Sequence, residues 1–167
     1  MKKYLTLILT LLSFYTLYSQ ENDTIMDYSM KLIQKQEFAK AIPYLQKYST
    51  SNPDHLNSKL QLAFCYTQTG DLNKSIELYQ NILAERPNYH RAYYMLANIY
   101  YRQDNSSTAL EMINSALSME ESDPDYLLMK GQALRKTGDL KQACKYFKKA
   151  KKEGSSEAKF EYTKYCK

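Results

Sequence analysis

The chain has 167 residues and a formal net charge of +5, with 44% hydrophobic and 25% charged residues. This length suits one ordinary domain, and the balance of apolar and charged residues excludes a wholly disordered chain. Only four glycines and four prolines occur, so few residues interrupt helices.

The first nineteen residues have the layout of a secretory signal peptide. Lys2 and Lys3 form a basic start, a mostly apolar run extends from Leu5 to Leu17, and polar residues follow from Gln20. A retained membrane anchor is the alternative, but about 14 apolar-leaning residues fall short of the roughly 20 that span a bilayer. We therefore expect residues 1–19 to be cleaved near Ser19 and Gln20, leaving a periplasmic or secreted protein.

The rest of the chain repeats itself every 34 residues. Four units abut without a gap, at 22–55, 56–89, 90–123 and 124–157. Small residues recur at two positions of the repeat. The first position holds Ala63, Ala97 and Gly131, and the second holds Ala41, Ser75, Ala109 and Ala143. Bulky residues recur at a third, at Leu45, Tyr79, Ile113 and Phe147. Such a period is typical of stacked repeat proteins, in which small residues let helices approach and bulky ones fill the space between them.

Each unit has the pattern of two helices joined by a turn. In the unit 56–89, Leu62 and Tyr66 lie four residues apart and share a helix face. Gly70 follows and can adopt the positive φ that ends a helix. Tyr79 and Ile82 then mark the apolar face of a second helix. One hairpin cannot bury its apolar face alone, whereas three or more stacked hairpins can.

These residues and their spacing resemble the tetratricopeptide repeat family over nearly all of the chain beyond residue 21. The resemblance implies an all-α, right-handed α-solenoid of four helix hairpins within residues 20–157. Gln36 and Asp104 stand at the turn position that glycine usually fills, and Lys130 stands where the family usually has leucine.

A short last helix is expected at residues 158–167, where it covers the apolar end of the fourth unit. If the chain folds back near Gly154, Cys144 and Cys166 lie at similar heights on neighbouring helices. A disulfide between them suits an oxidising compartment, the alternative being two small buried thiols. Cys65 is interpreted as an apolar filler of the second unit.

The family resemblance also implies a partner-binding surface on the first helix of each unit. Its usual groove positions fall on Met26, Leu60, Phe64, Arg91, Tyr94, Asn98, Tyr101, Arg102, Leu128, Gln132 and Arg135. Exposed aromatic and arginine residues are favoured at protein interfaces. The expected ligand is a protein or peptide with an apolar and an acidic stretch, although Phe64 fits a place in the inter-repeat core equally well.

No motif nominates a catalytic residue, a metal site or a cofactor. The two histidines, His55 and His90, lie at unit boundaries without zinc-ligand spacing and are interpreted as solvated loop residues. No phosphate-binding loop or nucleophile elbow occurs. The sequence therefore predicts a binding protein and not an enzyme.

Basic residues gather at the end of the chain, where residues 124–167 hold 12 basic and five acidic residues. Four lysines line one face of the expected second helix of the fourth unit, at Lys141, Lys145, Lys148 and Lys152. Export argues against nucleic acid as the partner. The leading hypothesis is an exported scaffold that binds a protein or peptide in its groove, and the alternative is an assembly factor that meets the membrane surface through these lysines.

Overall fold

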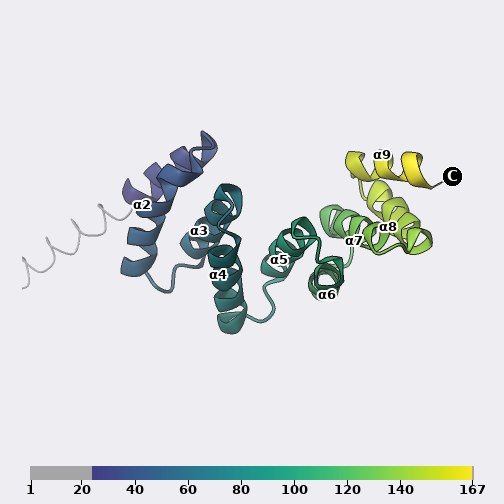
Figure 1. Cartoon of the computed structure of the whole chain (residues 1–167). Helices are drawn as coiled ribbons and strands as arrows, with labels where there is room; N and C mark the ends of the chain where they lie inside the picture. The colour runs from purple at the N-terminus through teal and green to yellow at the C-terminus, as the bar shows by residue number, and fades with distance from the viewer. Residues whose placement is uncertain (1–23, 167) are drawn as a thin grey trace, which may run out of the picture. The chain divides into compact units, whose positions relative to one another are not determined.

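The computed structural model describes residues 24–166, and the expected signal peptide at 1–19 lies outside that range. The predicted all-α class is confirmed, since every regular element in the described range is a helix. Residues 24–34 are helical and are followed by α2 (Phe38–Ser51), α3 (Leu56–Thr69), α4 (Leu72–Glu85), α5 (His90–Arg102), α6 (Ser106–Leu117), α7 (Pro124–Lys136), α8 (Leu140–Lys152) and α9 (Ser156–Tyr165) (Figure 1).

The helix starts follow the period seen in the sequence. Helices α3, α5 and α7 begin at residues 56, 90 and 124, while α2, α4, α6 and α8 begin at 38, 72, 106 and 140. Both series advance by 34 residues, so equivalent positions of successive repeats occupy equivalent positions on their helices. The described residues divide into two compact units, 24–75 and 76–166, with the boundary inside α4.

In the first unit, α2 packs on α3, and the start of α4 is held by a hydrogen-bonded serine. The Ser75 hydroxyl lies 2.8 Å from the Ala63 carbonyl oxygen, to which it donates, and 2.6 Å from the Thr67 hydroxyl. All three residues are buried. A serine is tolerated at this small-residue position because its polar group is fully partnered.

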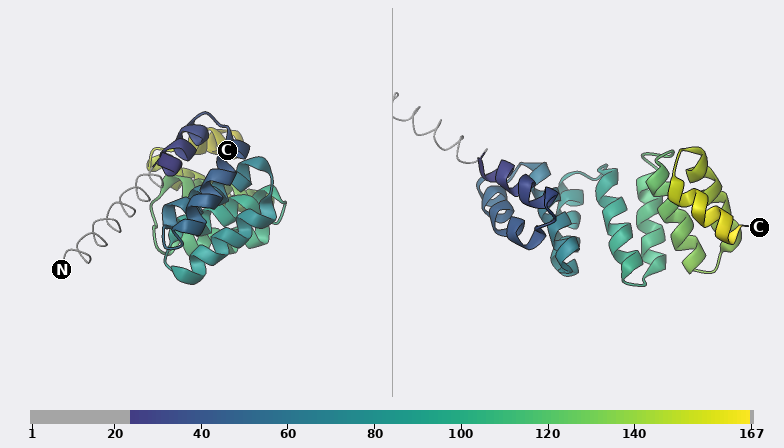
Figure 2. Two further views of the ribbon diagram at one scale, coloured as in Figure 1. Left: turned by 90° about the vertical axis from the view of Figure 1, so that its left-hand side faces the viewer. Right: turned by 90° about the horizontal axis from the view of Figure 1, so that it is seen from above.

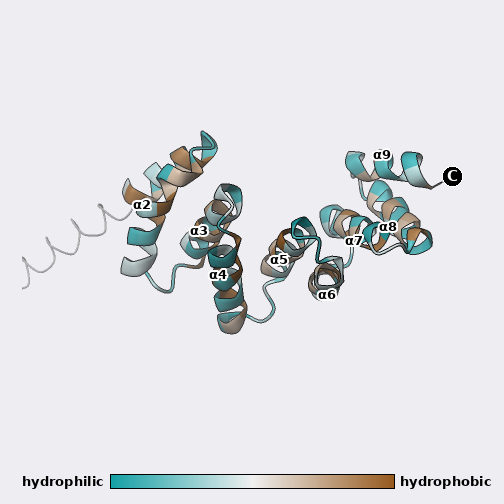
Figure 3. Cartoon of the chain, viewed as in Figure 1, coloured by the Kyte–Doolittle hydropathy of each residue, from teal (hydrophilic) through white to brown (hydrophobic). Residues whose placement is uncertain are grey.

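In the second unit, each helix from α5 to α9 packs on the next one along the chain (Figures 1 and 2). Phe147, Ile113 and Leu96 are among the large side chains with almost no exposure. Helices such as α8 carry hydrophobic residues on the packed side and hydrophilic residues elsewhere along the ribbon (Figure 3). Burial of this apolar face is what holds the helices together.

Three glycines and two other residues adopt positive φ at the ends of helices. Gly70 has φ of 88° and Gly138 of 92°, as the repeat pattern requires of a turn residue. Gln36 and Asp104 occupy the same position with φ of 60° and 62°. An L-residue in this conformation costs about 1–2 kcal/mol, so these two turns carry a strain that the glycine turns lack.

Replacing Gln36 with glycine is expected to raise the free energy of unfolding by about 0.5–1 kcal/mol. Relief of the strained φ outweighs the additional backbone entropy that glycine loses on folding. Urea unfolding of the full chain measures the change. Gln34→Gly is the matched control, because residue 34 is helical and the same substitution there should destabilise by about 1 kcal/mol. Equal losses in both variants would show that the turn stores no strain.

The last helix ties back to the fourth repeat through a covalent bond. The predicted Cys144–Cys166 disulfide is present, joining α8 to the residue that follows α9, with the two Cα atoms 5.6 Å apart. Helix α9 begins at Ser156, two residues earlier than expected. The earlier start follows from the side chain of Ser155, which accepts a hydrogen bond from the Ala158 amide and so caps the helix.

Candidate functional site

The candidate binding surface of the second unit is built on the first helices of two consecutive repeats, α5 and α7, which lie in contact. The rings of Tyr94 on α5 and Tyr126 on α7 are 4.8 Å apart at an interplanar angle of 31°. Tyr94 is partly exposed, whereas Tyr126 is buried. The pair therefore anchors one edge of the surface on the hydrophobic core.

His90 is part of this cluster, which corrects its interpretation as a solvated loop residue. A ring nitrogen of His90 lies 2.8 Å from the Tyr126 hydroxyl oxygen. Burial raises the pKa of Tyr126, so its hydroxyl keeps its proton and can donate the hydrogen bond to the ring nitrogen of His90. The sequence held one signal of this contact. A bulky tyrosine at position 126 replaces the small residues Ser58 and Ala92 of the two preceding repeats.

His55 also differs from its interpretation as a solvated residue. Its side chain accepts a hydrogen bond from the Ser58 amide and caps the start of α3, and its ring meets that of Tyr48 edge to face at 5.0 Å between centroids. Both histidines thus have structural partners within their own unit.

The middle and end of α5 present polar and aromatic groups. Asn98 donates one amide hydrogen to the carbonyl oxygen of Tyr94, at 3.0 Å. Near the end of the helix, the Lys136 ammonium lies 4.5 Å from the centroid of the Tyr101 ring and also pairs with Asp104. Tyr101 is therefore held in place by a cation on its ring while remaining partly exposed.

Three of the predicted groove positions, all on α7, are already engaged within the chain: Leu128 is buried, whereas Gln132 and Arg135 are partly exposed but contact α9. Leu128 is only 7% exposed and belongs to the hydrophobic core. The Gln132 amide donates to Glu157 of α9 at 3.0 Å, and the Arg135 guanidinium pairs with Glu161 at 3.4 Å. Arg135 also lies over the ring of Tyr165, 4.6 Å from its centroid. The terminal helix, rather than a ligand, contacts Gln132 and Arg135.

The predicted positions of the second unit that are neither buried nor engaged by α9 all lie on α5. We call them the α5 face, and they are Arg91, Tyr94, Asn98, Tyr101 and Arg102. The two arginines are exposed, and the other three residues are partly exposed. At 100° per residue, Arg91, Asn98 and Arg102 fall within about 40° of one another, and the two tyrosines form a parallel stripe beside them.

In the first unit, the predicted positions Met26, Leu60 and Phe64 are each partly exposed. The ring of Phe64 packs edge to face on Phe38 at the start of α2, with 5.6 Å between centroids. Phe64 therefore serves the packing of α2 on α3, in line with the alternative that it belongs to the core. These three side chains are apolar, so they offer no charged group to a partner.

Neither an exposed thiol nor a metal-binding cluster occurs among the described residues. Cys65, the one described cysteine outside the disulfide, is buried, and burial raises the pKa of its thiol to about 11. No group of three or more histidine, cysteine or acidic residues within 24–166 is arranged to hold a metal ion. Over the same range, no helix has the length and apolar character needed to cross a membrane.

Comparison with known families decides the class of this helical repeat. One tetratricopeptide repeat model matches residues 32–78 and 70–133, and a second matches residues 124–153. The chain belongs to the tetratricopeptide repeat family. Over 96 residues this tetratricopeptide repeat protein is 31% identical to a TPR repeat-containing protein of Methanocaldococcus jannaschii, and the match covers 58% of the chain but 17% of that relative.

Solved structures of tetratricopeptide repeat proteins share the fold. A crystal structure of MamA aligns with a TM-score of 0.71 at 22% identity, covering 84% of this chain and 76% of that one. MamA 41-end from Desulfovibrio magneticus RS-1 gives 0.73 at 16%, covering 80% and 75%. A thermophilic TPR protein from Thermus thermophilus gives 0.73 at 18%, covering 86% and 80%. Identities this low establish the helical repeat fold alone.

Proposed function

We propose that this tetratricopeptide repeat protein is a non-enzymatic scaffold whose α5 face binds a peptide segment of another protein. The observation that carries the proposal is the pair of exposed arginines beside two partly exposed tyrosines on one helix. Within the described residues, neither Arg91 nor Arg102 forms an ion pair, and the Asn98 side-chain oxygen accepts no hydrogen bond. Tyrosine and arginine, with tryptophan, are enriched among the residues that contribute most of the binding energy at protein interfaces.

The spacing of the arginines indicates the chemistry of the partner. Arg91 and Arg102 are eleven residues apart on a helix, which separates them by about 16 Å along its axis. An extended peptide covers that distance in about five residues. The proposed partner segment therefore carries two acidic residues about five positions apart, with apolar or aromatic side chains between them that pack on Tyr94 and Tyr101.

A photo-crosslinking amino acid at position 98 of the full chain tests this proposal in intact cells. A partner crosslinked there should be lost when Arg91 and Arg102 are both changed to glutamate, because charge reversal at two contacts weakens binding at least about tenfold. Lys145→Glu with Lys148→Glu makes the same change of net charge on exposed α8 and should leave capture intact. Equal loss in both double variants would refute a specific role for the α5 face.

We also propose that the protein is exported. Support comes from the signal-like layout of residues 1–19 and from the Cys144–Cys166 disulfide, since such bonds persist mainly in oxidising compartments. Sequencing of the mature amino terminus is expected to begin at Gln20. A mature chain that still begins at Met1 would contradict cleavage.

A second candidate function is association with an anionic membrane surface through α8. The four lysines of the predicted basic face are all exposed, and within the described range none of them forms an ion pair with a carboxylate. Basic residues near an anionic surface contribute about 1 kcal/mol each. Sedimentation with phosphatidylserine vesicles, abolished by added salt and by Lys145→Glu with Lys148→Glu, would favour this function over the first.

A further inference from the structure

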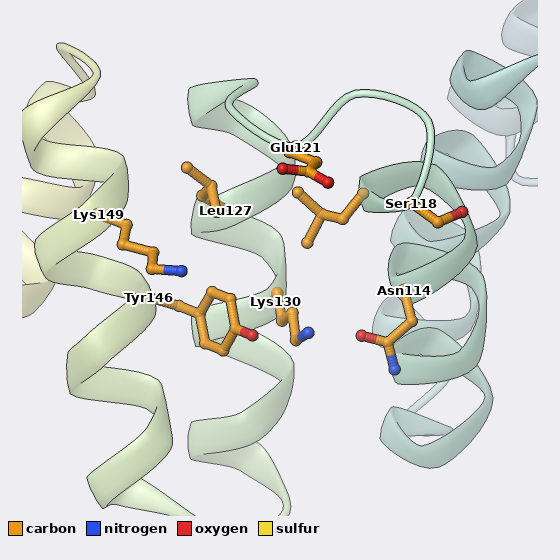
Figure 4. Close-up of a pocket in the computed structure, with 8 residues that line it drawn as sticks. Asn114, Ser118, Glu121, Leu127, Lys130, Tyr146 and Lys149 are labelled. Carbon is orange, nitrogen blue, oxygen red and sulfur yellow. The ribbon is translucent and has the colours of Figure 1, made fainter.

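A polar pocket of 310 Å³ lies among α6, α7 and α8, away from the α5 face (Figure 4). It opens between three helices of the second unit, and the connection from α6 to α7 forms one end. Its polar and aromatic lining includes Asn114, Ser118, Glu121, Lys130, Tyr146 and Lys149. A volume near 300 Å³ is at the lower end for sites that take a small ligand or one or two residues of a peptide.

The cationic character of the pocket comes from a departure from the repeat pattern. Lys130 occupies the position held by Leu62 and Leu96 in the two preceding repeats, and both leucines are buried. Lys130 itself is partly buried. A lysine in place of a core leucine gives up apolar burial and must desolvate part of a charge. Departures from the repeat pattern that carry such a cost are expected at functional positions.

Two ammonium groups converge on one aromatic ring in this pocket. The Lys130 nitrogen lies 4.3 Å and the Lys149 nitrogen 5.4 Å from the centroid of the Tyr146 ring. Figure 4 shows the nitrogens of Lys130 and Lys149 on either side of the Tyr146 ring, with Glu121 at the far end of the pocket. Within the described residues, neither lysine forms an ion pair with a carboxylate, although Glu121 lines the same pocket. The ring orients the two cations and leaves their charge uncompensated.

We propose that this pocket binds the carboxyl terminus of a peptide. The terminal carboxylate meets Lys130 and Lys149, with the Asn114 amide as a further hydrogen-bond donor. The backbone N–H groups next to the terminus donate toward the Glu121 carboxylate. Glu121 disfavours a phosphate group, because a dianion beside that carboxylate meets stronger repulsion than a singly charged carboxylate does. The pocket is separate from the α5 face, so this site does not depend on the proposed function.

Nuclear magnetic resonance titration of the full chain with three probes tests the site. N-acetyl-dialanine carries a free terminal carboxylate, its carboxamide lacks the charge, and inorganic phosphate supplies a different anion. Addition of N-acetyl-dialanine should shift the backbone amides of residues 114–121 and 146–149, and the carboxamide should bind at least about tenfold more weakly. Lys130→Leu should weaken binding of the carboxylate probe by a similar factor while raising the melting temperature, because it restores the leucine of the other repeats.

Lys145→Met is the matched control, since it removes one positive charge from an exposed position of α8 and should leave the titration unchanged. A folded Lys130→Leu protein that binds N-acetyl-dialanine as tightly as the unaltered chain would overturn the proposal. Equal affinity for the carboxamide, tighter binding of phosphate, or an absence of shifts with any probe would overturn it as well.

Discussion

Replacing Gly131 with alanine is expected to lower the free energy of unfolding by about 3 kcal/mol, although alanine is the better helix former. A Cβ atom at this position would lie 2.5 Å and 2.6 Å from two ring carbons of Phe147. Phe147 has no exposed surface and cannot move aside without disturbing the core. Overpacking of this kind costs about 1–3 kcal/mol and more where the neighbour is rigid.

The neighbouring repeat supplies a matched rescue. Ala97 and Ile113 occupy the positions equivalent to Gly131 and Phe147, and both are fully buried. The double variant Gly131→Ala with Phe147→Ile reproduces that alanine–isoleucine pair and should recover most of the lost stability. Urea unfolding of the full chain with far-ultraviolet circular dichroism measures both variants. A double variant no more stable than Gly131→Ala alone would show that the clash with Phe147 is not the cause.

Removing the disulfide is expected to cost about 3 kcal/mol. The bond closes a loop with a sequence separation of 22 residues, and restricting the unfolded chain over that length accounts for a stabilisation of this size. The loss should concentrate in α9, where Cys166 ends the helix and Ala158 is the one fully buried residue. Hydrogen exchange of the α9 amides should therefore rise more than that of α7.

Chemical unfolding with and without a reductant checks this expectation. Reductant should destabilise the unaltered chain and should leave Cys144→Ala with Cys166→Ala unaffected. Cys65→Ala serves as the control, because this buried thiol lies in the first unit and is not part of the bond, so the variant should keep its sensitivity to reductant. A double alanine variant as stable as the oxidised chain would contradict a stabilising role for the disulfide.

The repeat pattern predicted the helices, and the fold-back expected near Gly154 together with an expected oxidising compartment favoured the disulfide. Helix starts depend on local signals such as the apolar spacing around Leu62 and the turn at Gly70, and these recur every 34 residues. Cys144 and Cys166 were paired because they lie a similar number of residues from the turn, and that number sets the height of each cysteine along its helix. Local geometry and regular spacing carry both predictions.

The candidate site was predicted only in part. Repeat numbering placed Leu128, Gln132 and Arg135 on a binding surface, but it does not say which other helix covers that surface. On helix α9, Glu157 accepts a hydrogen bond from Gln132 and Glu161 forms an ion pair with Arg135. His90 was missed for the same reason, since its partner Tyr126 lies 36 residues away on another helix.

By itself, the sequence determined the class of fold, the length of each repeat and the core side chains that recur with the repeat, such as Ile113 and Phe147, because these follow from periodic apolar patterning within short stretches of chain. Only the tertiary structure decided which polar groups remain available to a partner. The α5 arginines are left without ion pairs in the described chain and Lys130 shares a pocket with Lys149, whereas Arg135 is already paired. That distinction depends on contacts between distant helices, where charges and hydrogen-bond donors either find a partner or keep their capacity to bind one.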